Sequence, residues 1–219
     1  SPETIKGMHT TVPSVNKMLS QEFDTSFLKE NETITPNGAI FSRDKQGFVP
    51  ELLYKMYIER KEIKKQMLQA EQEYEDTKDP KFLNLISRYK NKQMALKIAL
   101  NSAYGAMGNQ YFRFYDIRIA EAVTFGGQLS IRWIEIALNK YLNELLKTEG
   151  VDYVLASDTD SVYITFESLI EKLQPKDPVK FLDSVCSDKI EPFITQTYQD
   201  LADYTNAYEQ KMIMAREVI

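Results

Sequence analysis

The chain has 219 residues, 43% of them apolar, and a formal net charge of −5 at pH 7, so its overall charge gives no indication of nucleic-acid binding. No apolar run approaches the roughly 20 residues that a membrane-spanning helix needs, and no signal peptide is visible. The single cysteine, Cys186, excludes an internal disulfide and fits a reducing compartment.

The first fifty residues predict one helical start and one small β element. The opening SPETI suits a capped first turn, because Ser is a good N-cap and Pro fits the first helical position. Further on, Asn37-Gly38 and residues 44–47 are turn signals around short apolar runs. This pattern predicts a β element between residues 33 and 50.

Two long helices joined by a short polar link are predicted next. Apolar residues recur at three- and four-residue spacing from Pro50 to about Asp76. The link TKDP, residues 77–80, breaks the pattern, and a second helix runs from Lys81 to about Tyr104. Because so short a connection leaves little other geometry, the two helices should form an antiparallel hairpin.

The rest of the chain predicts an α+β fold with a small antiparallel sheet, packed helices and the protruding helical hairpin. The remaining predicted elements are a glycine-bearing loop at 104–116, a helix at 117–147, two strands around the turn SDTDS, helices at 167–174 and 178–206, and a final strand at 210–219.

Two carboxylates stand at the predicted reversal between the paired strands. Asp158 and Asp160 suit an ordinary polar turn, because Asp, Ser and Thr favour turns for local reasons. They also suit a pair of metal ligands held by a tight reversal. A calcium loop of the EF-hand kind needs Gly at position six and Glu at position twelve. Tyr163 and Leu169 occupy those positions, which excludes that kind of site.

The helical hairpin is locally basic. Residues 55–97 carry eleven Lys or Arg against seven Asp or Glu. Arg60 and Lys64 share one face of the first helix, and antiparallel pairing would bring Lys97 of the second helix towards them. Arg offers a planar fork to phosphate, and Lys offers a mobile point charge. A solvated face neutralised by neighbouring Glu residues is the alternative interpretation.

Two motifs resemble those of family B DNA polymerases. Residues 97–105 carry the pattern KxxxNSxYG, which resembles the fingers-helix motif of that family. SDTDS resembles its palm motif, usually Tyr-Gly-Asp-Thr-Asp-Ser, although Ala156-Ser157 replace Tyr-Gly here. The likeness to the T-even-phage branch extends over essentially the whole chain, including SPETI, TPNGAIFSRDKQGFVP, ERKEIKKQML and QLSIRWIEIALNKYLNELLKTEG.

The resemblance implies a partial polymerase palm with a fingers subdomain. Residues 1–50 would belong to the palm, 51–106 to the fingers hairpin, and 107–219 to the palm with the Asp-Thr-Asp hairpin. It also implies nucleotidyl transfer from a deoxynucleoside triphosphate (dNTP) to a primer 3′-hydroxyl, in DNA replication, by a two-metal mechanism with Mg²⁺, or Mn²⁺ as a substitute. Primer–template DNA and dNTPs would be partners, and the cytoplasm of an infected host cell would be the location.

Roles for individual residues follow from the same resemblance. Asp160 is expected to ligate metal directly, with Asp158 beside it in a lesser or water-mediated role. Glu217 is expected to be an auxiliary acidic residue near the metals, whereas Ala215 replaces another position that is often acidic. The expected nucleotide-binding residues are Arg60, Lys64 and Lys97 at the triphosphate, Asn101 in the same pocket, and Tyr104 and Gly105 at the nascent base pair.

Several family features are expected outside this chain. The family's first metal-binding aspartate lies in a motif just before a SPETI-like segment, and this chain begins at SPETI. We therefore expect that motif, the exonuclease and the thumb to act in cis or in trans, and the isolated chain to have little activity. The hairpin also looks shorter than in T-even enzymes.

Two alternatives of other kinds stay open. One is a non-catalytic nucleic-acid-binding or interaction module that retains the polymerase fold. The other is a different two-metal palm enzyme such as a nucleotide cyclase, against which the fingers motif at 97–105 argues.

Overall fold

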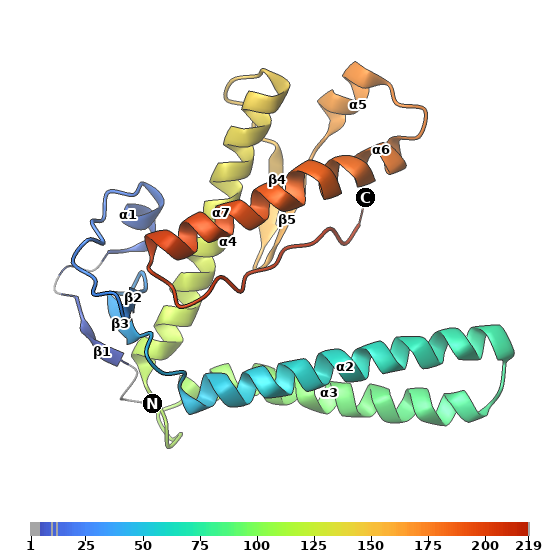
Figure 1. Ribbon diagram of the computed structural model, residues 1–219, viewed down its shortest axis with the longest axis horizontal. Coiled ribbons are helices and arrows are strands. Elements are labelled where there is room, and N and C mark those ends of the chain that lie inside the picture. The colour runs from blue at the N-terminus through green and yellow to red at the C-terminus, as the bar shows by residue number, and fades with distance from the viewer. Residues whose placement is uncertain (1–4, 10, 12, 219) are drawn as a thin grey trace. The chain divides into compact units, whose positions relative to one another are not determined.

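The computed structural model describes residues 5–9, 11 and 13–218 (Figure 1). They form two compact units, one containing Asp44–Ala120 and the other combining Lys6–Arg43 with the chain from Glu121 onwards. The predicted capped start at residues 1–3 lies outside the described residues, and the first described element is a strand, β1 (Ile5–Met8).

The first unit consists mainly of the predicted antiparallel helical hairpin. Helix α2 (Phe48–Thr77) ends at Lys78, whose left-handed backbone lets its N–H bond the carbonyl of Tyr74. Helix α3 (Lys81–Met107) returns beside it, and an ion pair of 2.9 Å joins Lys92 to Glu59 across the hairpin. The helices are longer than predicted, because α2 begins at Phe48 and α3 continues through Gly105.

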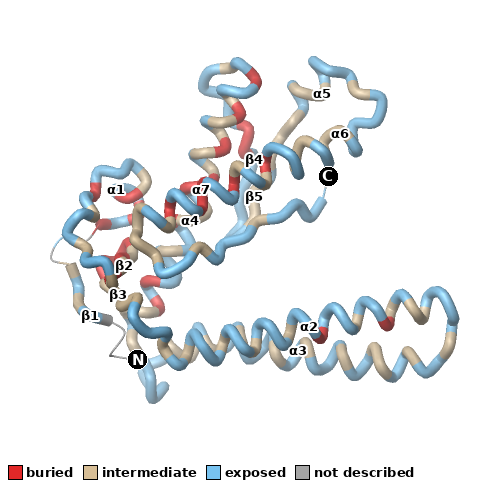
Figure 2. Tube along the Cα trace, viewed as in Figure 1, coloured by how far each residue is buried: buried red, intermediate tan, exposed pale blue. Residues whose placement is uncertain are grey.

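The hairpin has little core of its own. In α2 only Ile63 and Ala70 are buried, and no described residue of α3 is buried (Figure 2). Packing within the pair therefore comes from half-buried side chains along the seam.

The loop after α3 is fixed by aromatic and ionic contacts. The Phe114 ring packs on Phe48 at the start of α2, with ring centroids 4.8 Å apart. At its end, Asp116 accepts the backbone N–H of Arg118 at 3.0 Å and pairs with its guanidinium at 2.7 Å. Hydrogen bonding to Arg118 lowers the pKa of Asp116. This carboxylate thus caps α4 (Ile117–Leu146).

The second unit contains the predicted small β element within a three-stranded sheet. Strands β2 (Glu32–Ile34) and β3 (Ala39–Ser42) pair antiparallel, and β1 lies on the other side of β3. Gly38, with a φ of +85°, supplies the conformation that the turn between them needs. Short helix α1 (Val15–Leu19) packs with the sheet in a cluster that includes Trp133 and Leu201.

Helix α4 supplies the centre of the second unit. Ile134, Leu138 and Leu142 follow one another at four-residue intervals and are fully buried. They pack with Tyr198 and other apolar residues of the C-terminal helices. Near the other cluster, the Trp133 Nε1 donates a hydrogen bond to the carbonyl of Thr197 at 3.2 Å. One helix thereby joins both clusters.

The remaining elements follow α4 in the predicted order. They are β4 (Val154–Asp158), β5 (Ser161–Ile164), α5 (Glu167–Leu173), α6 (Pro178–Val185), a π turn η1 (Cys186–Ile190) and α7 (Glu191–Tyr204). The predicted helix at 178–206 therefore contains a π turn. The π turn ends two residues before Pro192, which has no N–H to donate and disfavours regular α-helical bonding at this point.

The predicted final strand is wrong for residues 210–218, which are assigned to no strand. A segment forms a strand only where a neighbouring strand accepts its backbone hydrogen bonds. The α+β class is confirmed by the helices and the two small antiparallel sheets. Among the helices of the described residues, none is long and apolar enough to cross a membrane.

Candidate functional site

The β4–β5 hairpin is fixed at its base by a side chain of α4. The Asn139 Oδ1 accepts the backbone N–H groups of Tyr153 at 2.8 Å and Val154 at 3.0 Å. Its Nδ2 donates to Asp152 at 2.7 Å. Tyr153 and Val154 are both buried, so this amide satisfies two backbone donors that water does not easily reach. The direction in which β4 leaves the core is thereby set.

Asn139 was not singled out by the sequence, and its role leads to a prediction. Asn139→Ala should lower the free energy of unfolding by about 1–3 kcal/mol, because it leaves buried donors without partners. Urea denaturation followed by circular dichroism measures this. Lys140→Ala, at the exposed neighbouring position, is the matched control and should change stability by less than about 0.5 kcal/mol. Equal losses in the two variants would contradict the role given to Asn139.

The tip of this hairpin is a tight and strained reversal. Asp158 pairs with Ser161, which leaves only Thr159 and Asp160 in the loop. Thr159 has a φ of +54°, although a β-branched residue rarely adopts positive φ. The Asp160 N–H bonds the Asp158 carbonyl at 2.6 Å, which closes the turn. Such backbone conformations cost on the order of 1–3 kcal/mol and are concentrated at functional sites.

The two carboxylates at the tip differ in their surroundings. Both are exposed, and one oxygen of Asp158 accepts the Thr159 hydroxyl at 3.0 Å. The Asp160 carboxylate has no hydrogen bond or ion pair with any residue that the structure describes. Burial, and to a smaller extent the charge of Asp160, raise the pKa of Tyr198. Asp160 is therefore the carboxylate whose charge is less compensated.

The donor set at the tip fits a partial magnesium site. Mg²⁺ in enzymes is held by one or two carboxylates together with water and substrate phosphates. Asp158 and Asp160 place two carboxylates, which is that number of oxygen donors, on a short turn. In the described part of the chain, no three or more His, Cys, Asp or Glu side chains form a group that could hold a metal ion. Glu217 thus does not join the pair in this structure.

The predicted triphosphate ligands of the helical hairpin have no acidic partners among the residues that the structure describes. Arg60, Lys64 and Lys97 form no ion pair within the described residues, whereas Lys55 and Lys92 pair with Glu51 and Glu59. The Arg60 Nε is buried and has no hydrogen-bond partner in the described part of the chain. Leaving a buried donor without a partner costs free energy.

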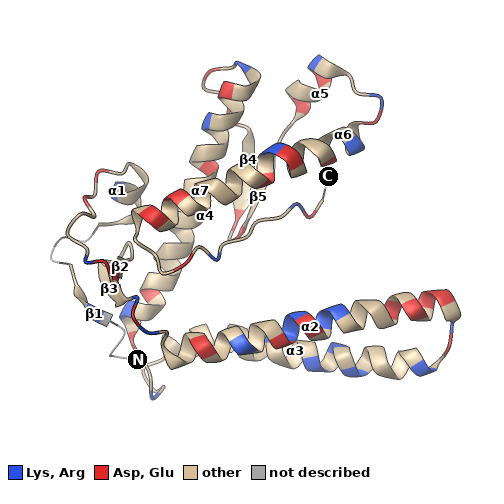
Figure 3. Cartoon of the chain, viewed as in Figure 1, with Lys and Arg blue, Asp and Glu red and all other residues tan. Residues whose placement is uncertain are grey.

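The three cationic residues lie at different heights along the axis of the hairpin. The Glu59–Lys92 pair fixes the local alignment of α2 and α3. From this pair, Lys64 lies five residues towards the far end of the hairpin, and Lys97 lies five residues towards its base. At a rise of 1.5 Å per residue, the two are about 15 Å apart along the axis, and Arg60 lies between them. Figure 3 shows Lys and Arg on both helices and the acidic end of α2 beyond them.

Lys97, Asn101 and Tyr104 share one exposed face of α3. Their spacing of four and three residues places them on successive turns, and all three are exposed. Gly105 follows on the same turn, and a Cβ there would meet no atom within 4 Å. Packing between described residues therefore does not require glycine at this position, and the prediction of a close backbone approach there remains open.

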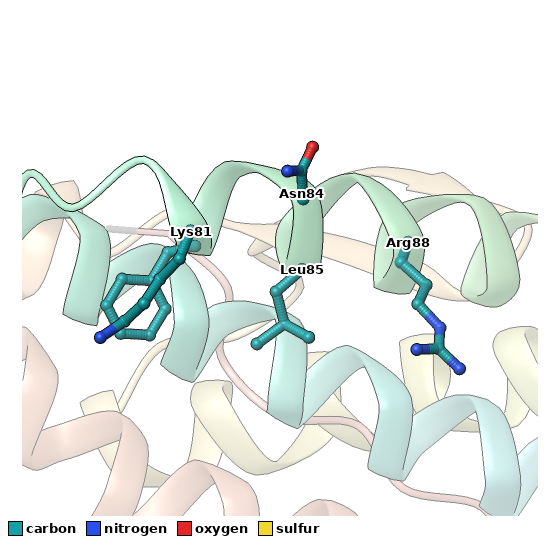
Figure 4. A pocket seen from close by; sticks show the side chains of 5 residues that line it. Lys81, Asn84, Leu85 and Arg88 are labelled. Atoms are coloured by element: carbon teal, nitrogen blue, oxygen red, sulfur yellow. The ribbon is translucent and has the colours of Figure 1, made fainter.

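A hollow on the hairpin lies apart from these residues. It has a volume of about 310 Å³ and is lined by residues at the start of α3, namely Lys81, Phe82, Asn84, Leu85 and Arg88. In Figure 4 the side chains of Lys81, Leu85 and Arg88 extend to one side of the helix and Asn84 to the other. No predicted site residue lines it.

The predicted site residues thus form two sets. Asp158 and Asp160 belong to the second unit, and the basic and aromatic residues of the hairpin belong to the first. The sequence analysis did not identify Asn139, which binds the base of β4, or Tyr198, whose pKa is raised by burial and by the charge of Asp160. Both are polar residues within helical segments that are otherwise rich in apolar residues, which is a weak signal in the sequence.

Comparisons with known proteins agree on one family. DNA polymerase family B matches residues 1–176 of the chain. The DNA-directed DNA polymerase of Enterobacteria phage T4 is 32% identical over 272 residues, and that of Escherichia phage RB69 is 30% identical over 269; each match covers 100% of this chain and 29% of the relative. DNA polymerase 1 of Pyrococcus abyssi is 31% identical over 159 residues, covering 73% of this chain and 18% of that protein.

The chain thus spans less than a third of the phage polymerases that it matches. The family match and the two full-length alignments agree with the order of the hairpin motif and the Asp-Thr-Asp turn in the chain. The chain belongs to DNA polymerase family B.

Proposed function

We propose that this chain supplies the palm and fingers of a template-directed DNA polymerase that acts in DNA replication. The supporting observation is the Asp158–Asp160 tip, where a strained turn holds one uncompensated carboxylate in a family B chain. Because the chain spans 29% of its phage relatives, the proposed activity belongs to a larger polymerase. Its exonuclease, thumb and remaining metal-binding aspartate would be supplied by other segments, in cis or in trans.

The carboxylate tip would hold the metal ions of the reaction. Two Mg²⁺ ions, or Mn²⁺ in their place, would stabilise the charge on the attacking and leaving oxygens. Asp160, whose carboxylate forms no hydrogen bond or ion pair with a described residue, would bind metal directly. Asp158 would take the secondary place, since Thr159 already occupies one of its oxygens. The strained turn would keep both carboxylates in place before substrate arrives.

The basic hairpin would bind the incoming dNTP. Arg60, Lys64 and Lys97 would contact the triphosphate, and their charge would offset the charge that develops on the pyrophosphate leaving group. Asn101 would line the same pocket. Tyr104 and Gly105 would stand at the nascent base pair. Their shared face on α3 supports this arrangement.

Removal of Lys97 tests the nucleotide role. Lys97→Ala should weaken binding of a fluorescent dNTP to the chain by about 10- to 100-fold, because a hydrogen bond to a charged group contributes about 1.5–3 kcal/mol. Lys90→Ala is the matched control, since Lys90 is exposed on the same helix two turns away. The nucleotide role is wrong if the two variants bind equally well.

Primer extension tests the whole proposal. The purified chain alone, with Mg²⁺, primer–template and four dNTPs, should extend the primer little or not at all. Addition or fusion of the remaining polymerase segments should restore extension. Efficient extension by the chain alone would contradict the need for those segments. Binding of primer–template without extension in the complete assembly would favour the non-catalytic module instead. The expected location, the cytoplasm of an infected cell, rests on the phage origin of the two relatives.

A further inference from the structure

One side of α2 is turned away from α3 and is exposed. Met56, Ile63 and Ala70 recur at seven-residue intervals, are buried or half-buried, and mark the seam between the two helices. The residues on the opposite side of α2 are exposed. We name this side the outer face of α2, and its members are Tyr54, Tyr57, Ile58, Lys61, Lys65 and Leu68.

Two lysines give the outer face a positive charge. Lys61 and Lys65 form no ion pair within the described residues. Glu59 and Glu62 are the nearest acidic residues along α2. Glu59 is already paired with Lys92 of α3 at 2.9 Å, and Glu62 lies on the flank of the helix, about 100° round from Lys61. This charge therefore suits an anionic partner.

The outer face is distinct from the surface proposed for the triphosphate. Lys61 and Lys65 follow Arg60 and Lys64 by one residue each, so they lie about 100° further round the helix. Arg60 is half-buried at the seam, whereas Lys61 and Lys65 are exposed. A ligand on the outer face is therefore not the dNTP of the proposed reaction.

Two tyrosines extend the outer face towards the base of the hairpin. Tyr54 and Tyr57 are each 50% exposed and lie one turn apart. Tyr57, Lys61 and Lys65 follow one another at four-residue intervals. From Tyr54 to Lys65 the face extends about 16 Å along the axis, at 1.5 Å per residue. Aromatic rings and cations thus share one exposed surface.

We propose that the outer face of α2 binds single-stranded DNA. Lys61 and Lys65 contact phosphates, and Tyr54 and Tyr57 stack on unpaired bases. Proteins that bind single strands without sequence preference combine these two kinds of contact. The strand is the unpaired template of the polymerase, and this identification alone rests on the proposed function.

The charge of the outer face favours a nucleic acid over a protein partner. Ile58 and Leu68 are 45% and 52% exposed and could contact an apolar helix, but Lys61 and Lys65 lie between them. Enclosing a lysine in an apolar interface costs free energy unless an anion pairs with it. A single strand offers such an anion at every nucleotide.

The phosphate contacts are tested by the anisotropy of a fluorescein-labelled oligothymidylate of about 20 nucleotides, mixed with the purified chain. Lys61→Ala/Lys65→Ala should weaken binding about tenfold or more. The slope of log K against log salt concentration should become shallower by about 1.4, since each contact to a single-strand phosphate contributes about 0.7. Lys140→Ala/Lys176→Ala removes the same charge from exposed positions elsewhere and should change neither quantity.

Stacking is tested by Tyr54→Leu/Tyr57→Leu. Leucine retains an apolar side chain and favours the helix, but it has no ring to stack on a base. Binding of the oligothymidylate should weaken about tenfold or more, and the salt slope should stay the same, because stacking releases no counterions. The unmodified chain should bind a blunt DNA duplex of equal charge more weakly. Circular dichroism should show that all variants retain their helices.

The possible results separate the parts of this proposal. If the lysine variant and its control bind equally, or if the unmodified chain does not bind the oligothymidylate, the outer face is not a DNA site and a protein partner becomes the better occupant. Unchanged binding by the tyrosine variant would overturn stacking. Equal affinity for the duplex would overturn the preference for a single strand.

This inference and the proposed function can fail separately. Nucleotide binding is measured through Lys97→Ala, which lies outside the outer face, so a negative result with the oligothymidylate leaves the nucleotide role intact. In the complete polymerase, the lysine variant should weaken binding of a primer–template with a long single-stranded template overhang and leave binding of a blunt-ended one unchanged. Equal weakening of both would overturn the identification of the strand as template.

Discussion

Asp160→Asn is expected to lower the rate of primer extension by the complete polymerase about 10³-fold or more, which corresponds to about 4 kcal/mol of transition-state stabilisation. Asn has nearly the same size but lacks the charge that would hold a divalent cation. The Asp160 carboxylate forms no hydrogen bond or ion pair with a described residue, so its replacement should leave the hairpin intact. Single-turnover extension with Mg²⁺, at saturating dNTP, measures the effect on the chemical step.

Two further variants locate the effect at the tip. Asp158→Asn should cause a smaller loss, because Thr159 already engages one oxygen of that carboxylate. Asp152→Asn, at the base of the same hairpin, is the control and should retain activity, since Asn still offers an oxygen to Asn139. Retention of more than about a tenth of the activity by Asp160→Asn would contradict its assignment as the direct ligand.

Leu142→Ala should produce a large loss of stability in the second unit. Leu142 is fully buried within the cluster that supports the base of β4. Truncation of such a side chain leaves a cavity and costs about 2–5 kcal/mol. The midpoint of urea denaturation should fall accordingly, with little change in the slope of the transition.

Leu145→Ala is the matched control for this substitution. Leu145 lies three residues further along α4 and is 45% exposed, so its truncation removes less buried surface. We expect a loss below about 1 kcal/mol. Equal losses in the two variants would show that the cluster around Leu142 does not dominate the stability of this unit.

The sequence analysis was most accurate for elements that neighbouring residues determine. Helix α4 is close to its prediction because its apolar residues follow a 3.6-residue period and Asp116 caps its start. The helical hairpin follows from two periodic segments and a four-residue link. The reversal at Asp158–Asp160 follows from turn residues between two apolar runs.

The sequence analysis was least accurate where the structure depends on contacts between residues far apart in the chain. Asn139 bonds backbone groups that lie 14 and 15 residues away, and nothing in its neighbourhood indicates this. Residues 210–218 were predicted as a strand, but Arg216 of this segment bonds the side chains of Asp183 and Glu191 instead of a neighbouring strand. Helix α3 continues through Gly105 to Met107, where a loop was predicted.

The near absence of a core in the helical hairpin has a consequence for how such a chain can diverge. Each turn of α2 and α3 is stabilised mainly by the turn beside it, as in a repeat protein whose units contact only their neighbours. Insertion or deletion of whole turns at the far end then leaves the base undisturbed, and each turn changes the length by about 5.4 Å. The length of the helical hairpin can thus change by whole turns without changing the packing of the rest of the fold.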